Sequence, residues 1–323
     1  MKGFISLTFL GTGASHPTRD RWLPGILVRV RDEFILLDCG EGVQYRILDA
    51  GLKVNKLSMV LISHLHGDHV YGLPGLLESL NSWSLARDLL LVGPPQLAKM
   101  LDALELYEKL NFRVKFVEAR DGAQLRGQGY KVTVRKVEHG VDAYAYVIDE
   151  DPLPGEFNNE KAQLLGIPPG PLRAKLVQGE PVVLDDGRIV YPEEVVSPSK
   201  KGLRIAYSGD TAPCPSLIEA AKDADLLVHE ATFSSKHGTE ASLSFHSTSV
   251  DAARVARQAR VKLLILTHFS NRYRDSDLDA LLAEARETFL RSYLARDMMR
   301  IELRRFGTEW LLAEFGQIPN LNG

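Results

Sequence analysis

The sequence contains few cysteines and no long apolar run. Only Cys39 and Cys214 occur among its 323 residues, far apart and in no paired pattern. This argues against a disulfide-stapled scaffold and a cysteine-rich zinc site, and it fits a reducing environment. No apolar run is long enough to cross a bilayer, and the N-terminal stretch MKGFISLTFLGTG is typical of a strand rather than a secretory signal. We therefore expect a cytoplasmic protein.

An excess of basic residues is also missing. The chain has 39 Lys and Arg residues against 42 Asp and Glu residues, a formal net charge of -3. Because a phosphate backbone favours basic surfaces, this balance weighs mildly against a nucleic-acid binder, although a local basic patch stays possible. The composition is otherwise that of an ordinary globular protein, and the length allows one large domain or two.

Short apolar strands alternate with helices in both halves of the chain. We expect strands at residues 4–10, 25–30, 34–38, 58–63, 89–93, 112–119, 130–139, 203–210, 225–232 and 262–269. We expect helices at residues 41–51, 70–83, 94–110, 214–224, 247–259 and 277–295. This alternation in two halves predicts a layered fold with polar residues gathered at the strand ends.

One segment interrupts the alternation. Residues 149–202 are rich in proline and glycine and contain only brief apolar pieces. A structureless stretch of this length is uncommon inside a compact domain unless it is functional. We interpret it as an inserted arm that protrudes from a single domain over residues 1–323. A surface insertion without function is the alternative.

Residues 63–69, SHLHGDH, place four metal-binding side chains in one turn after a buried strand. His64 and His66 are two residues apart, so an extended backbone puts both on one side. Asp68 and His69 follow on the turn and can face a second ion. Histidine and carboxylate ligands without cysteine suit zinc, or else manganese or iron.

Later strands also end in residues that can bind a metal. These residues are His139, Asp210, His229 and His268. For any one of them a structural role would be the simpler interpretation. Because each follows a buried-strand pattern, we expect them to arrive at the same edge of the sheets, next to the SHLHGDH turn.

The HxHxDH pattern with these later residues resembles the metallo-β-lactamase superfamily. The resemblance implies an α+β fold, a four-layered αββα sandwich, with a dinuclear zinc site at one edge. It implies that His64, His66 and His139 hold the first zinc. It implies that Asp68, His69 and His268 hold the second, and that Asp210 bridges both ions together with a hydroxide.

Further motifs resemble the ribonuclease Z family of tRNA 3′-processing endonucleases. They are FLGTGASHP at residues 9–17, HEATF at 229–233, FHSTS at 245–249 and GIPPGPLRAKLVQG at 166–179. The resemblance runs in order along essentially the whole chain, and the length matches the short, homodimeric form. It implies removal of 3′ trailers from precursor tRNA by a zinc enzyme with two ions per subunit. It implies a tRNA-binding arm with these residues: Gly166, Pro168, Gly170, Pro171, Arg173 and Lys175.

Three residues receive catalytic roles from this resemblance. Asp68 would orient the attacking nucleophile or accept its proton, in addition to holding the second zinc. His246 would donate a proton to the leaving ribose 3′-oxygen, and Glu230 would orient and charge His246. The alternative for His246 is an ordinary flank of the following helix, which Ser247 or Thr248 would cap.

Four other functions are weighed against this one. A small phosphodiesterase, arylsulfatase or lactonase of the same fold would need neither the arm nor the FHSTS loop. The mRNA-processing nucleases of the superfamily carry a large domain for which the spacing from Asp210 to His268 leaves no room. A flavo-diiron oxidoreductase would have Glu in place of His66. A non-catalytic RNA-binding protein with structural zinc would normally use cysteine ligands.

Overall fold

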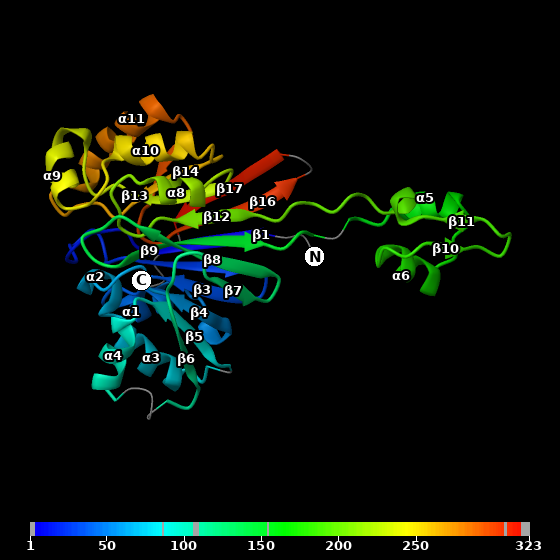
Figure 1. Ribbon diagram of the computed structural model, residues 1–323, viewed down its shortest axis with the longest axis horizontal. Coiled ribbons are helices and arrows are strands. Elements are labelled where there is room, and N and C mark those ends of the chain that lie inside the picture. Colours follow the sequence, from blue (N-terminus) through cyan, green and yellow to red (C-terminus); the bar gives the residue numbers. More distant parts are fainter. Residues whose placement is uncertain (1–3, 86, 106–109, 154, 307–308, 318–323) are drawn as a thin grey trace. The chain divides into compact units, whose positions relative to one another are not determined.

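The structure is a computed structural model that describes residues 4–85, 87–105, 110–153, 155–306 and 309–317. The chain divides into two compact units. Met1–Asp149 and Leu203–Gly323 form the first unit, called the body below, and Glu150–Gly202 form the second, called the insert (Figure 1). Within the described residues, no helix is both long and apolar enough to cross a membrane.

The first sheet of the body has eight strands in the order β17-β16-β1-β2-β3-β4-β5-β6. The strands β3 to β6 are parallel to one another, whereas β1, β2, β16 and β17 pair antiparallel. Their bounds are β1 Phe4–Gly11, β2 Gly25–Val30, β3 Glu33–Leu37, β4 Leu57–Leu61, β5 Leu89–Gly93, β6 Val114–Glu118, β16 Met299–Phe306 and β17 Glu309–Gln317.

The second sheet has seven strands in the order β15-β14-β13-β12-β9-β8-β7. The strands β12 to β15 are parallel, and β9 pairs antiparallel with β12. Their bounds are β7 Gln124–Gly127, β8 Tyr130–Val137, β9 Ala143–Glu150, β12 Arg204–Tyr207, β13 Leu226–Glu230, β14 Leu264–Thr267 and β15 Ser292–Leu294. Parallel strands carry their carboxyl ends to one edge, so the polar residues after β12, β13 and β14 meet there.

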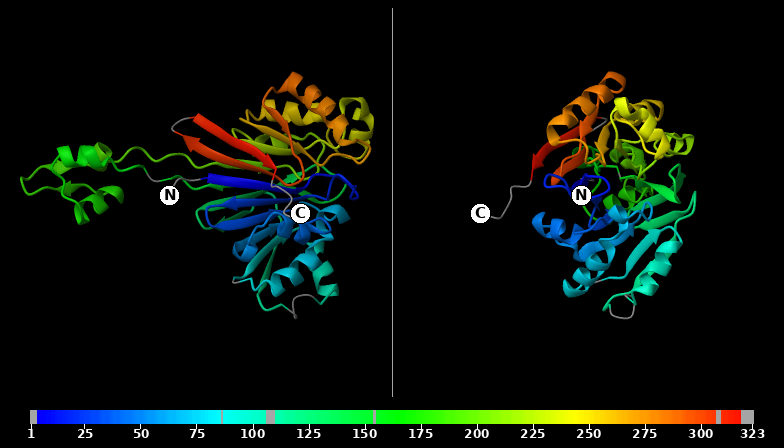
Figure 2. Two further views of the ribbon diagram at one scale, coloured as in Figure 1. Left: turned by 180° about the vertical axis from the view of Figure 1, so that it is seen from behind. Right: turned by 90° about the vertical axis from the view of Figure 1, so that its left-hand side faces the viewer.

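The helices of the body cover the outer faces of the two sheets, so the layers are helix, sheet, sheet, helix (Figure 2). One apolar core lies between the sheets and includes Ile35 and Ile265. Two further apolar cores lie on the outer faces, one between each sheet and the helices that cover it. The helices against the first sheet are α1 Val43–Asp49, α3 Leu73–Ser82 and α4 Gln96–Ala103, and those against the second are α8 Pro215–Ala220, α10 Ser249–Gln258 and α11 Leu278–Thr288. The predicted α+β, four-layered sandwich is confirmed.

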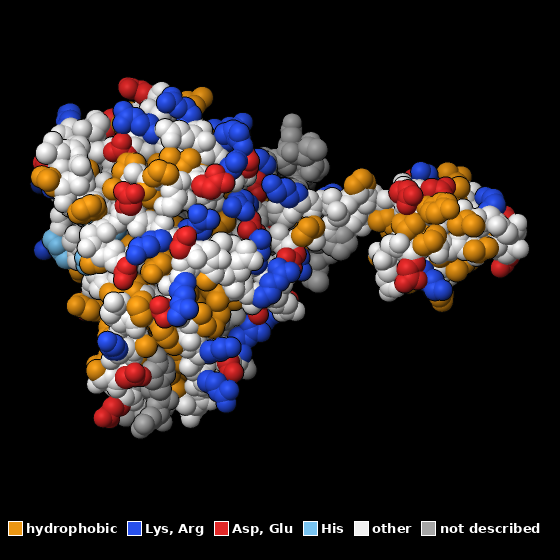
Figure 3. Space-filling model, in the orientation of Figure 1, with side chains coloured by type: hydrophobic (Ala, Val, Ile, Leu, Met, Phe, Trp, Pro, Cys, Tyr) orange, Lys and Arg blue, Asp and Glu red, His pale blue; other side chains and the backbone are white. Residues whose placement is uncertain are grey.

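The insert has a small core and secondary structure of its own. Its buried side chains include Ala162, Ile167, Leu176 and Val190. Its elements are α5 Asn159–Leu164, α6 Pro171–Val177, β10 Val182–Val183, β11 Ile189–Val190 and α7 Pro192–Val195. Hydrophobic side chains also gather on its surface (Figure 3). The exposed apolar residues of the insert include Leu164, 88% exposed, and Val183, 61% exposed.

Two predicted helix ends are wrong. The helix predicted at 94–110 ends at Ala103, and the backbone of Glu105 has a positive φ of 51°, which helices do not contain. Residues 106–109 of that prediction lie outside the described residues. The helix predicted to run to Ala295 ends at Thr288, and Ser292–Leu294 form β15 instead. Pairing with β14 decides this strand, and helical periodicity cannot reveal such a tertiary contact.

Candidate metal centre

The candidate site lies where the strands of both sheets end. His64 and His66 follow β4, and the short helix α2, Gly67–Val70, carries Asp68 and His69. His139 follows β8, Asp210 follows β12 and His268 follows β14. The seven predicted ligands lie in overlapping groups of side chains that could hold a metal ion, whereas His229, which was expected at the same edge, is in none of them among the described residues.

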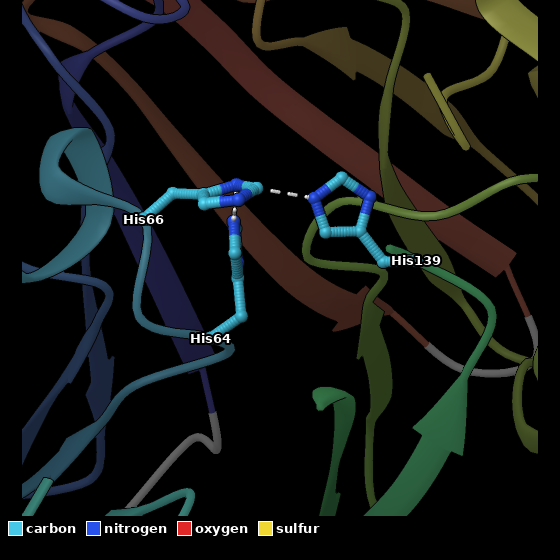
Figure 4. Close-up of side chains that lie close together, drawn as sticks. All are labelled: His64, His66 and His139. Carbon is cyan, nitrogen blue, oxygen red and sulfur yellow. Dashed lines mark hydrogen bonds between the residues drawn. The ribbon is translucent and has the colours of Figure 1, made fainter. Parts of the chain in front are cut away.

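The first group contains three histidines (Figure 4). His66 Nδ1 lies 3.0 Å from Nε2 of His64 and 3.2 Å from Nε2 of His139. Three ring nitrogens therefore converge on one point. Burial lowers the pKa of both His64 and His66, which favours the neutral imidazole that binds metal ions.

The second group contains Asp68, His69 and His268. The Nε2 atoms of His69 and His268 are 3.1 Å apart, and Asp68 Oδ2 lies 3.5 Å from Nε2 of His268. The backbone N–H of Ser15 donates to the same Asp68 oxygen over 2.7 Å, which holds the carboxylate in place.

Asp210 lies between the two groups. Its Oδ2 is 3.6 Å from Nε2 of His64 and 3.3 Å from Nε2 of both His69 and His268. Its Oδ1 is buried and accepts no hydrogen bond from the described part of the chain. A buried carboxylate oxygen without a donor is costly, and a cation would satisfy it.

Hydrogen bonds on the far side of the rings fix which nitrogen faces the cluster. His69 Nδ1 donates to Asp38 over 2.8 Å, and His268 Nδ1 donates to the Thr232 hydroxyl over 2.8 Å. His139 Nδ1 donates to the carbonyl of Phe245 over 3.0 Å. Each bond turns the Nε2 atom of its ring inward, as in histidine sites of metalloproteins. The residues present therefore fit metal ions.

His246 and Glu230 form a buried pair beside these groups. His246 Nδ1 donates to Glu230 Oε1 over 2.8 Å, and the other Glu230 oxygen accepts from the Thr232 hydroxyl over 2.6 Å. Burial disfavours a charged imidazole, but the adjacent Glu230 carboxylate outweighs it and raises the pKa of His246 to about 9. The pair can hold a proton next to the cluster at neutral pH.

His229 does not join the cluster. It is fully buried, and its Nδ1 donates to the carbonyl of Glu230 over 2.7 Å. Consecutive residues of a strand point to opposite faces, so only one of the two can reach the site from β13. In the structure, the side chain of Glu230 is the one that reaches the site.

The predicted arm residues all lie in the insert. Gly166 and Gly170 have positive φ angles of 75° and 121°, which explains glycine at both turns. The guanidinium of Arg173 donates to the Ile167 carbonyl and to Asn159, so it stabilises the insert's own fold. Lys175 is exposed.

Sequence reasoning missed Asp38, which the structure places at the centre of the supporting bonds. It accepts hydrogen bonds from the Ser63 N–H and hydroxyl, from His69 and from the Tyr207 hydroxyl, which lies 2.6 Å away. The signal was available, because Asp38 follows a buried strand in the same way as the predicted ligands.

The glycine turn after β1 serves close packing. A β-carbon at Gly11 would lie 2.0 Å from the carbonyl oxygen of Leu23, so only glycine fits there. This packing carries the chain to Ser15, whose N–H contacts Asp68.

Solved structures share this fold. The metallo-beta-lactamase fold protein YhfI from Bacillus subtilis matches with a TM-score of 0.66 at 20% identity, covering 93% of this chain and 99% of that one. The human tRNase Z, short form, matches with a TM-score of 0.65 at 24% identity, covering 92% and 98%. Two family models match parts of the chain, the Anti-Pycsar protein Apyc1 model at residues 5–146 and the Beta-lactamase superfamily domain model at residues 195–269. Fold and site together define a metallo-β-lactamase-fold protein with a metal centre of histidine and aspartate.

Curated relatives show to which family within this fold class the chain belongs. Ribonuclease Z of Methanosarcina acetivorans is 38% identical over 302 residues, which cover 93% of this chain and 98% of the relative. Ribonuclease Z of Myxococcus xanthus is 43% identical over 287 residues, covering 88% and 93%. The chain belongs to the ribonuclease Z family.

Proposed function

We propose that this chain is a metal-dependent endoribonuclease that removes 3′ trailers from precursor tRNA. The tRNA keeps a 3′-hydroxyl and the trailer carries a 5′-phosphate. The observation that carries the proposal is the proton-holding pair His246–Glu230 beside two groups of metal ligands, in a chain of this family. A phosphodiester cleaved at its 3′-oxygen needs both an activated nucleophile and an acid for the leaving group.

The metal ions are proposed to be two zinc ions per subunit. His64, His66 and His139 would hold one, Asp68, His69 and His268 the other, and Asp210 would contact both. Zinc supplies a Lewis acid for the phosphoryl oxygens and lowers the pKa of water to about 7. Nitrogen and carboxylate ligands of this kind are those that catalytic zinc prefers.

Asp68 and His246 would move the protons. Asp68 orients the attacking water and can accept its proton, because the Ser15 N–H fixes one of its oxygens over 2.7 Å. His246 presents Nε2–H to the leaving 3′-oxygen, since its Nδ1 is engaged by Glu230. Glu230 keeps the imidazole oriented and charged until the proton is given up.

The insert is proposed to be the tRNA-binding arm, with the turn Gly166–Pro171 and the exposed Lys175 as its contacts. Arg173 supports that turn from inside the insert. An element with its own small core can present such a turn without disturbing the metal centre.

The enzyme is proposed to be a cytoplasmic homodimer. Helix α1 buries Val43 and Ile47 but leaves Tyr45 60% and Leu48 56% exposed, an apolar surface that a second copy of the chain would cover. Cys39 and Cys214 are buried free cysteines, which suits a reducing cytoplasm.

One preparation of the pure protein tests this proposal. A precursor tRNA with a 3′ trailer should be cut to a 3′-hydroxyl product, metal analysis should approach two zinc ions per chain, and sedimentation should give the mass of two chains. Hydrolysis of small phosphodiesters, sulfate esters or lactones without any cleavage of the tRNA precursor would refute the endoribonuclease and favour another hydrolase of this fold. Full activity after exhaustive chelation would refute the metal.

A further inference from the structure

Phe245 combines an unusual backbone with an exposed ring. Its φ is +56°, in the left-handed region that favours glycine, and its side chain is 48% exposed. Phe245 follows the C-cap of α9, Gly238–Leu243, where the N–H groups of Phe245 and His246 bond the carbonyls of Ser242 and Ala241 and where glycine is the usual residue. A bulky residue is strained in this conformation, and nearly half of Phe245 stays exposed. Retaining phenylalanine at such a position points to a use for the ring.

The backbone and the ring of Phe245 do different things. Its carbonyl oxygen accepts the Nδ1–H of His139 over 3.0 Å, so the backbone orients a metal ligand. Its ring lies next to Gly140, where a β-carbon would be 3.6 Å from the ring. The backbone bond to His139 needs no side chain, so the ring must be explained separately.

Two other apolar side chains that lie near His139 and His246 in the sequence are also exposed. Val141, in the loop after His139, is 44% exposed, and Leu243, the last residue of α9, is 78% exposed. Neither Phe245 nor these two residues belongs to the cores of the body. In proteins that bind single-stranded nucleic acid, exposed aromatic rings of this kind stack against bases.

We propose that the ring of Phe245 is a stacking platform for a base of the substrate, that of the nucleotide whose 3′-oxygen leaves. The proposal rests on the endoribonuclease function above. The leaving oxygen takes its proton from His246, the next residue in the chain, so its nucleotide lies on the Phe245 side of the centre. Asp68, which accepts the N–H of Ser15, would face the attacking water under that function.

The variant Phe245→Gly separates the ring from the backbone, because glycine adopts the left-handed conformation without strain. Cleavage would be measured on three precursor tRNAs: a normal one, one abasic at the last tRNA nucleotide and one abasic at the first trailer nucleotide. The wild type should lose about ten- to a hundredfold in kcat/KM on the precursor abasic at the last tRNA nucleotide, the usual effect of one stacked base.

Phe245→Gly should show the same loss on the normal precursor and no further loss when that base is missing. When the first trailer base is missing, kcat/KM of Phe245→Gly should fall by the same factor as kcat/KM of the wild type. If loss of the ring and loss of the last tRNA base lowered kcat/KM independently, so that the two factors multiplied, the proposal would be overturned. It would also be overturned if the effect of Phe245→Gly depended only on the first trailer base. A wild type that does not cut the normal precursor would instead refute the proposed function.

Two controls test whether the ring is merely structural or merely apolar. Phe245→Gly should keep its metal and unfold at no lower temperature than the wild type; a lower unfolding temperature with no base-dependent loss would make the ring structural. Leu243→Ala, two residues away, should cleave all three precursors as the wild type does. The same coupling in Leu243→Ala would show that Phe245 is not the platform.

Discussion

At the scale of single residues, the partner of the second ring nitrogen determines what each histidine can do. His268 and His139 donate that N–H to a hydroxyl and to a carbonyl, which turns the other nitrogen, Nε2, toward the ligand groups. His246 donates it to the buried carboxylate of Glu230, which favours the charged ring. The geometry also groups His246 with His139 and Asp210, so a variant of His246 can separate a proton donor from a metal ligand.

His246→Ala should slow cleavage of precursor tRNA by about 10²–10⁴-fold, because the leaving oxygen loses its proton donor. Metal content and precursor binding should be unchanged. His237→Ala is the matched control, since His237 bonds Tyr273 and Ser234 and lies outside the ligand groups of the described residues. Single-turnover kinetics with metal analysis would measure both variants. Wild-type cleavage by His246→Ala would make His246 a helix flank, and loss of metal would make it a ligand.

Residue patterns predicted most of the site because strand ends are readable in the sequence. His64, His139, Asp210 and His268 each follow a short apolar run. His229 and Glu230 show the limit: both end the same strand, and the pattern cannot say which face each side chain takes. Glu230 was found through its motif, whereas Asp38 has no motif of that kind and was missed.

At the scale of elements, Asp297 joins three segments around the loop at residues 12–22. It accepts a hydrogen bond from the Thr12 hydroxyl and one from the Trp22 N–H, each over 2.7 Å. Arg46 of α1 lies 3.9 Å from Asp297 and 5.1 Å from the ring of Trp22. Burial nevertheless dominates and raises the pKa of Asp297 to about 6. This carboxyl supports the loop that carries Ser15 to Asp68.

Asp297 should make the fold less stable as pH rises. Its folded pKa of about 6 lies above an unfolded value of about 3.9, so the folded state binds the proton more tightly. Stability is therefore lost between about pH 4 and pH 6, by about 2–3 kcal/mol. Asp297→Asn removes this dependence and can still bond Thr12 and Trp22. The unfolding temperature of Asp297→Asn minus that of the wild type should rise by a few degrees from pH 5 to pH 7.5.

The control for this prediction is Asp20→Asn, which removes an exposed carboxyl from the same loop. Its difference from the wild type should stay constant over that pH range. A constant difference for Asp297→Asn as well would contradict a raised pKa of Asp297. Because differences are compared, pH effects on the metal ligands cancel.

Elements with a strong local pattern were predictable, and those fixed by partners were not. The helix at Ser249–Gln258 has a capping box, since Thr248 and Asp251 bond each other's backbone, and it was found. The strand at Ser292–Leu294 has only three residues and depends on β14, so it was taken for helix. Helix ends near residue 103 were misplaced because apolar spacing continues beyond the last helical turn.

At the scale of the whole molecule, the distribution of charge limits how the insert could hold RNA. The segment 150–202 contains nine acidic and six basic residues, so it is not a general polyanion binder. Three of its cations are engaged, Lys200 with Glu156, Arg188 with Asp186 and Arg173 with Asn159. Arg204, just after the insert, belongs to the body and bonds Asp149. Lys175 and exposed apolar side chains such as Tyr191, 50% exposed, are then the candidate contacts.

Removing the insert should therefore separate substrate binding from chemistry. Strands β9 and β12 are antiparallel neighbours with Asp149 opposite Arg204, so a short Gly/Ser turn can replace residues 150–202. The shortened protein should keep its metal and its hydrolysis of bis(p-nitrophenyl) phosphate, because all predicted ligands lie in the body. Its KM for precursor tRNA should rise about tenfold or more, which corresponds to about 1.4 kcal/mol of lost binding.

Two point variants divide that loss by its physical origin. Lys175→Ala should weaken precursor binding and lower the slope of log affinity against log salt by about one, because one phosphate contact is lost. Tyr191→Ala should weaken binding without changing that slope, since an apolar contact releases no counterions. Filter binding at several salt concentrations measures both, and Lys222→Ala, an exposed lysine of the body, is the control.

Unchanged tRNA affinity in the shortened protein would refute the proposal that the insert is a tRNA-binding arm. Loss of small-substrate hydrolysis while the shortened protein is folded and metal-loaded would refute it as well.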